Sequence, residues 1–196
     1  MYILREIIAG TAGVLAFVAY VPYLLDIFRG RVLPARSTRV MFAILLSIVT
    51  LQQIQLGARL TLAVTLGEWL GSVILLLITL RHGHGGLRRI DIVCYVLLAV
   101  DLLLWLGTGS ALLALFLSII ADVIAFTPTL HKTWLHPRSE TPMFYLLGVV
   151  AALLNLLVVP HLTLAIALYP LALAIENAIE LMLIYRRGLT DDTIAI

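Results

Sequence analysis

The chain has 196 residues, of which 62% are hydrophobic and only 12% are charged, and its mean hydropathy is +1.10. This composition excludes a water-soluble globular domain. The net charge of +2, with no basic tract, argues against a nucleic-acid partner. A single cysteine, Cys94, allows neither an intrachain disulfide nor a zinc framework.

Charged residues, glycines and prolines divide the sequence into seven apolar segments, each close to the roughly 20 residues that a membrane-spanning helix needs. A transmembrane β-barrel would show short alternating strands instead of these long Leu, Ile, Val and Ala runs. The first segment continues without a cleavage pattern, so we expect a mature helix and not a signal peptide. We predict an all-α membrane protein with spans at residues 6–28, 40–57, 61–80, 91–107, 110–131, 142–159 and 163–185.

The basic residues are distributed unequally between the two ends of these predicted spans. Eleven of the thirteen Lys and Arg residues fall on one side, and only Arg5 and Arg59 fall on the other. Since cytoplasmic loops carry the excess of basic residues, this pattern predicts an outside N-terminus and a cytoplasmic C-terminus in a plasma (inner) membrane. On this count no basic residue lies within a span.

The sequence contains an internal repeat. Tyr20–Leu24 (YVPYL) reappears 106 residues later as Phe126–Leu130 (FTPTL). Two further pairs follow in the same order: Pro34–Thr38 with Pro137–Thr141, and Gly67–Trp69 with Ile175–Asn177. Such matches favour a duplicated unit of three helices.

One helix lies between the two predicted triplets, so both would have the same orientation in the membrane, as in parallel-repeat transporters. We therefore predict two parallel three-helix bundles joined by a linker helix. The predicted regions are a first repeat (1–80), a loop and linker helix (81–109), a second repeat (110–187) and a short cytoplasmic tail (188–196).

Acidic residues occur inside the predicted spans although basic ones do not. They are Glu68, Asp101, Asp122, Glu176 and Glu180. A carboxylate in lipid is costly unless it is protonated, paired or hydrated, so such residues usually face the bundle interior or a water-filled cavity. Two interpretations stay open: some are functional, and some are neutral acids hydrogen-bonded between helices. The sequence leaves the role of Asp101 undetermined.

Glu68 and Glu176 occupy matching repeat positions, which favours a shared binding site near the middle of the membrane. The predicted substrate-binding residues are Glu68, Trp69, Gln52, Asn155, Glu176 and Asn177. An aromatic face with amides and carboxylates suits a sugar or a small cation. Trp69 could equally be an aromatic residue at the membrane–water interface, and Gln52 could form an ordinary hydrogen bond between helices.

Pro22 and Pro128 each remove a backbone hydrogen bond at matched places, so we predict paired hinges there. Asp122, close to Pro128, and Glu180, one turn from Glu176, are the predicted sites of proton or cation coupling. His82-Gly83-His84 offers only two metal ligands, so no metal site is expected. No catalytic motif is found, and neither an enzyme activity nor a cofactor is predicted.

With these residues, the layout resembles the PQ-loop superfamily, which includes the SWEET and SemiSWEET (MtN3) sugar transporters and the KDEL receptor. More narrowly, Ala121–Thr129 with Lys132–Trp134 and Glu140-Thr141 looks like a bacterial group of seven-helix membrane proteins within it. The resemblance implies hinge prolines at Pro22 and Pro128, sugar transport, and a sugar-contacting asparagine at Asn177. The chain departs from the pattern at Tyr23 and Thr129, where the family has a signature glutamine.

The leading hypothesis is a transporter that moves a small polar or cationic solute by alternating access, and the sequence leaves open whether transport is facilitative or coupled to protons. The alternative is a membrane ligand-binding or sorting receptor of the same fold that transports nothing. An intramembrane enzyme using paired carboxylates is a third hypothesis, with no nucleophile to support it. The expected partners are a small-molecule solute and the lipid bilayer, and homo-oligomer formation stays open.

Overall fold

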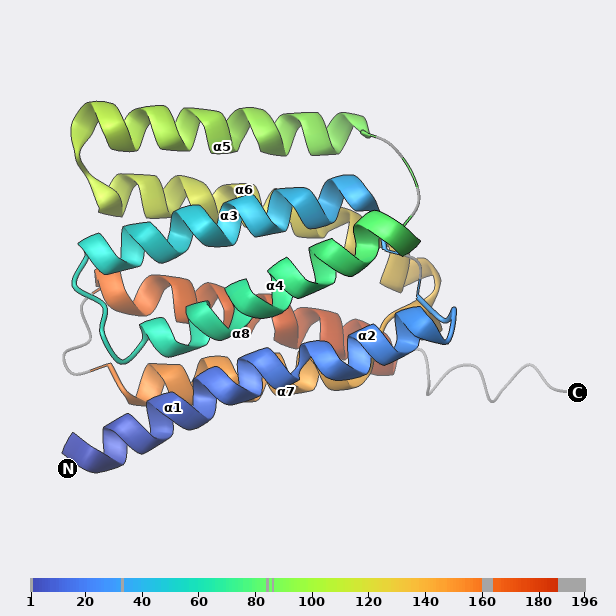
Figure 1. The fold of residues 1–196 in the computed structure, drawn as a ribbon, viewed down its shortest axis with the longest axis horizontal. Coiled ribbons are helices and arrows are strands. Elements are labelled where there is room, and N and C mark those ends of the chain that lie inside the picture. The colour runs from blue at the N-terminus through green and yellow to red at the C-terminus, as the bar shows by residue number, and fades with distance from the viewer. Residues whose placement is uncertain (1, 33, 84, 86, 160–163, 187–196) are drawn as a thin grey trace, which may run out of the picture.

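The computed structural model describes residues 2–32, 34–83, 85, 87–159 and 164–186, and within these ranges it is helical with no β-strand. Short connections join the helices, all of which lie roughly along one direction (Figure 1). In chain order the helices are α1 (Tyr2–Val18), α2 (Tyr20–Phe28), α3 (Arg36–Gln55), α4 (Leu62–His82), α5 (Arg89–Thr108), α6 (Ala111–Leu135), the 3₁₀ turn η1 (Pro137–Ser139), α7 (Pro142–Leu157) and α8 (Leu164–Arg186).

Six helical stretches are long and apolar enough to cross a membrane. They are Ile3–Phe28, Arg36–Gln55, Leu62–Arg81, Arg89–Thr108, Ala111–Leu135 and Ala165–Arg186, and Pro142–Leu157 is a shorter apolar helix. Large apolar side chains face outward, as Leu103 and Leu106 do on α5 with 69% and 74% exposure. Such surfaces are stable only against lipid or protein. The chain is therefore an all-α membrane protein.

Local sequence signals explain where the helices begin and end. Gly109 has φ 65°, a left-handed conformation that glycine adopts without steric cost, and it ends α5. The Ser110 side chain then accepts a bond from the Leu113 amide at the start of α6. At the other end of α5, the Asp91 carboxylate accepts the Arg88 backbone N–H at 2.9 Å, which satisfies a free helix-end donor.

The first span is divided at Ala19, between α1 and α2. Pro22 has no amide hydrogen to donate to the carbonyl four residues earlier, so it weakens the helix at Val18. Pro128 is different, because α6 continues through it. Of the two predicted hinge positions, only the first coincides with an interruption of the helix.

Two groups of helices show similar internal packing: α1 with α2, α3 and α4, and α6 with α7 and α8. α4 packs against both α1 and α3, and α8 packs against both α6 and α7. The groups meet where α1 contacts α7 and α3 contacts α6. α5 contacts α6 and α3 and lies at the edge of the molecule (Figure 1). Successive spans alternate in direction, so α1, α4, α6 and α8 all run from the end that holds the N-terminus toward the opposite end (Figure 1).

Buried apolar residues fill the interface between the groups on the side of α5. The largest apolar cluster there joins Met41 and Leu45 of α3 to Leu98 of α5, Leu115 of α6 and Tyr169 of α8. A second cluster joins Tyr20, Tyr23 and Leu75 with Phe144 packed against it. The two clusters leave polar side chains between them, where the cavity lies.

Candidate functional site: a polar cavity between the helix groups

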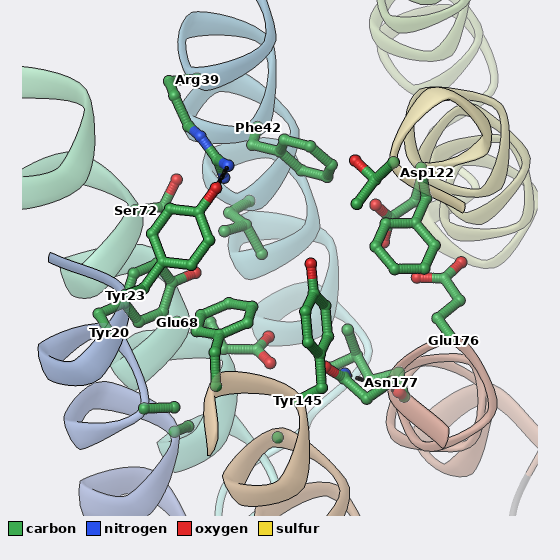
Figure 2. Close-up of a pocket in the computed structure, with 18 of the residues that line it drawn as sticks. Tyr20, Tyr23, Arg39, Phe42, Glu68, Ser72, Asp122, Tyr145, Glu176 and Asn177 are labelled. Carbon is green, nitrogen blue, oxygen red and sulfur yellow. Dashed lines mark hydrogen bonds between the residues drawn. The ribbon is translucent and has the colours of Figure 1, made fainter. Parts of the chain in front are cut away.

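A cavity of about 100 Å³ lies between the two helix groups. It is lined by residues from α1, α2, α3, α4, α6, α7 and α8 and by Ala19 at the α1–α2 junction (Figure 2). Its polar lining consists of Tyr20, Tyr23, Arg39, Glu68, Ser72, Asp122, Thr129, Tyr145, Tyr169, Glu176 and Asn177. Since a single water needs roughly 10–15 Å³ on this measure, the cavity has room for several waters or a small solute.

Three carboxylates meet in this cavity from three different helices. Glu68 comes from α4, Asp122 from α6 and Glu176 from α8. All three side chains belong to the lining of the same cavity. Asp122 is only 5% exposed. Like charges brought together inside a membrane protein are stable only when protons or cations neutralise them.

Arg39 of α3 also lines the cavity, which corrects the expectation that no basic residue lies within a span. Its guanidinium donates to the Tyr23 hydroxyl at 2.5 Å and lies 4.9 Å from the centre of the Tyr23 ring. α3 begins at Arg36, before the predicted start at residue 40, so Arg39 stands inside the helix. The cavity lining therefore contains one guanidinium and three carboxylates.

Aromatic rings complete the wall. Phe144 of α7 packs edge-on against Tyr20 and Tyr145, with ring centres 5.1 Å and 5.0 Å apart. The ring centre of Phe144 also lies 5.3 Å from that of Tyr23. Phe144 thus connects the second helix group to Tyr20 and Tyr23 of the first. Phe42 and Phe126 add further rings to the lining. Aromatic faces beside carboxylates provide a favourable surface for a positively charged or amphipathic solute.

Several polar atoms of the lining lack a protein partner. Glu68 Oε2, Glu176 Oε1, the Tyr169 hydroxyl and Arg39 Nε are buried, and none has a hydrogen-bond partner among the described residues. Tyr169 is 1% exposed. Buried polar groups are normally satisfied, so these atoms are available to bind water, a proton carrier or a solute within the cavity.

Four of the residues predicted for binding or coupling lie together here: Glu68, Asp122, Glu176 and Asn177. The Asn177 side chain donates to the Leu173 carbonyl of its own helix at 2.8 Å, which leaves its oxygen for other contacts. Figure 2 shows Asp122 and Glu176 pointing toward one another across the space between α6 and α8.

The structure places the other predicted binding residues away from this cavity. Trp69 donates to Ser47 Oγ at 2.9 Å and packs against the core cluster. Asn155 donates to the Thr61 carbonyl at 3.1 Å, joining α7 to the start of α4. Gln52 bonds to Asp101 between α3 and α5. None of these three lines the cavity.

Glu180, the second predicted coupling residue, lies outside the cavity lining. It is fully buried, and the Thr133 hydroxyl donates to its Oε1 while Oε2 has no partner in the described part of the chain. Nearby, Lys132 pairs with Glu140, which also accepts from the Tyr145 hydroxyl at 3.0 Å. The predicted tail 188–196 and His84 lie outside the described residues.

The sequence interpretation missed Arg39 and the tyrosines Tyr20, Tyr23, Tyr145 and Tyr169 as lining residues. Tyrosine in an apolar span has an amphipathic ring that suits an interface as well as a cavity, so no signal separated the two. Arg39 was detectable only as a basic residue beside the predicted start of a span.

Comparison with known proteins identifies no relative: no family model, curated protein or solved structure matches the chain. Across the residues that the structure describes, no group of three or more His, Cys, Asp or Glu side chains has the arrangement to hold a metal ion. The chemistry of the cavity must therefore be inferred from its own residues.

Proposed function

We propose that the chain is a membrane transporter of the PQ-loop type that moves a small cationic or polar solute by alternating access. The observation that carries the proposal is the cavity between the two helix groups, with carboxylates from α4, α6 and α8 and a single guanidinium. Solute sites of secondary transporters lie at such interfaces between repeats.

The charges favour a cation over a neutral sugar. Three ionised carboxylates opposed by Arg39 alone would leave an excess of negative charge within the membrane, which is costly. A bound cation removes this cost, and so does protonation. The same site can therefore exchange protons for solute, and this exchange is the basis for proposing proton coupling through Asp122, with Glu180 one turn beyond the cavity on α8.

The two helix groups support a 3+1+3 arrangement. In this proposal α1 with α2, α3 and α4 form the first unit, α6, α7 and α8 form the second, and α5 is the linker. α4 and α8, the third helix of each unit, carry Glu68 and Glu176. Rocking of one unit against the other about the cavity would expose these carboxylates to each side in turn.

Counterflow in vesicles tests the proposal. The purified protein is reconstituted into liposomes loaded with unlabelled choline, and uptake of labelled choline is compared with that of labelled glucose. We expect choline uptake above protein-free vesicles, little glucose uptake, and a response of choline uptake to an imposed pH gradient. Binding of choline without counterflow would support the receptor alternative instead.

Substitutions identify the site. Glu176→Gln should lower choline counterflow about tenfold or more, as expected when a contact worth about 1.4 kcal/mol or more is lost, and should weaken the response to pH. Glu6→Gln, on the exposed face of α1, is the matched control and should leave uptake unchanged. Equal uptake by both variants would exclude the cavity as the transport site.

A further inference from the structure

Three polar side chains meet outside the cavity, at the junction of α3, α5 and α6. They are Gln52, Asp101 and Ser118, and each is 0% exposed. Gln52 Nε2 lies 3.1 Å from both carboxyl oxygens of Asp101. Ser118 Oγ lies 3.1 Å from Gln52 Oε1 and also within hydrogen-bonding distance of Asp101 Oδ2.

The hydrogens of this group can be counted. Ser118 Oγ makes two oxygen–oxygen contacts but has one hydrogen to donate. The amide oxygen of Gln52 can only accept, so the Ser118 hydrogen is needed in that contact. The contact with Asp101 Oδ2 then requires a second hydrogen, and only a protonated Asp101 can supply it. An ionised Asp101 leaves one of the two contacts without a hydrogen in a site closed to solvent, which is costly.

Rotating the Gln52 amide by 180° gives the same result. Its nitrogen would then donate to Ser118 Oγ, and the Ser118 hydrogen would go to Asp101 Oδ2. The amide oxygen would face the carboxyl group and would need a proton from it. Both orientations satisfy every contact only when Asp101 carries a proton.

The neighbours of Asp101 agree with this count. Its two hydrogen-bond partners, Gln52 and Ser118, are uncharged, and an unpaired carboxylate inside a membrane protein is energetically unfavourable. Asp91, at the start of the same helix, has the opposite surroundings. It accepts from the Arg88 guanidinium at 3.1 Å, the Arg88 amide at 2.9 Å and the Ser37 hydroxyl at 2.7 Å. All its partners are donors, which suits the ionised form.

We propose that Asp101 is held as a neutral carboxylic acid, whose proton completes the hydrogen bonds that join α5 to α3 and α6. This proton site is separate from the cavity and independent of the transport proposal. A second hydrogen-bonded contact joins α3 to α5 one turn further along α3. There Gln55 donates to the Gly109 carbonyl at 3.1 Å and accepts from Trp105. Asp101 thus acts as a positioning residue that fixes α5 and the start of α6 to α3.

Infrared difference spectroscopy of the purified protein tests the protonation state. The C=O stretch of a protonated carboxyl group is separate from the bands of carboxylates. We expect Asp101→Asn to remove one such band. Asp91→Asn on the same helix is the matched control and should remove none. Spectra of wild type and Asp101→Asn that coincide in this region would overturn the proposal, and so would an equal loss in Asp91→Asn.

Ser118→Ala provides a second measurement that keeps the carboxyl group and does not depend on the folding of Asp101→Asn. Loss of the Ser118 oxygen removes the acceptor of the Asp101 proton in the amide orientation described first, and the donor to Asp101 in the rotated one. In either case the carboxylic acid band should shift in frequency. An unchanged band would contradict the proposed hydrogen bonding of a protonated Asp101 to Ser118.

Discussion

Single buried contacts decide how tightly the carboxylates of this protein are held. Glu180 receives one hydrogen bond, from Thr133 of α6, and both residues are 0% exposed. Its second oxygen has no partner within the described residues. A carboxyl group held through one oxygen retains the freedom to change its proton or its partner, which the better satisfied Asp91 lacks.

We expect Thr133→Val to destabilise the protein by about 1–3 kcal/mol, because it keeps the shape of the side chain but leaves Glu180 without its donor. Thermal unfolding in detergent measures the loss. Thr127→Val is the control on the same helix, since Thr127 is exposed and bonds only to the Val123 carbonyl of its own helix. It should change stability by less than about 0.5 kcal/mol. Equal losses in both variants would show that the bond to Glu180 contributes nothing.

The candidate site could be predicted in part from the sequence, and neighbouring residues show why. Glu68 and Trp69 are adjacent, so their side chains point about 100° apart around α4. Only Glu68 reaches the cavity. Asn155 lies seven residues after Gly148, which lines the cavity, and is therefore about 10 Å further along α7. Sequence patterns identify a polar residue in a span without giving the face that it occupies.

At the scale of helices, close packing depends on small residues. A Cβ added at Gly67 of α4 would collide with the backbone oxygen of Gly13 in α1, and one added at Gly13 would lie 2.6 Å from the Ala63 oxygen. The two backbones are thus as close as glycine allows. Such small-residue contacts hold transmembrane helices together in lipid.

Gly67→Ala should therefore separate α1 from α4 and destabilise the protein by about 1–3 kcal/mol, the usual cost of overpacking. Unfolding in detergent measures this change. Gly10→Ala is the control, because nothing lies within 4 Å of its added Cβ. Removing a helix glycine there should be neutral or stabilising by up to about 1 kcal/mol. A stable Gly67→Ala variant would mean that the two helices can move apart without loss.

The helices themselves were largely predictable from the sequence. Each of the seven predicted segments contains a helix with ends within a few residues of the expected ones, because long apolar runs and the breakers between them are local signals. The differences are the division at Ala19, the start of α3 at Arg36, the start of α1 at Tyr2 and the end of α6 at Leu135. The second one matters, because a long Arg side chain inside the first turn of a span can reach a buried cavity.

At the scale of the whole molecule, the two ends of the bundle differ in charge and in packing. At the end that carries the N-terminus, the hydrogen bond from Asn155 to the Thr61 carbonyl joins α7 to the start of α4. Val64 is buried there in a cluster with Ala12 and Ala151. The cavity lies toward the other end, where Arg39, Lys132 and Glu140 are found. If the basic end is cytoplasmic, these contacts lie between the cavity and the outside.

Cysteine labelling tests this orientation, since the native Cys94 is 1% exposed and gives little background. Ile3→Cys and Arg59→Cys place a thiol at the N-terminal end, and Leu87→Cys places one in the connection between α4 and α5. Ile3 and Leu87 are 71% and 66% exposed. A membrane-impermeant maleimide should label Ile3→Cys and Arg59→Cys in intact cells but Leu87→Cys only after permeabilisation. The reverse pattern would show the opposite orientation, with the end that carries the Asn155–Thr61 contact in the cytoplasm. Labelling of all three in intact cells would contradict an odd number of spans between residues 59 and 87.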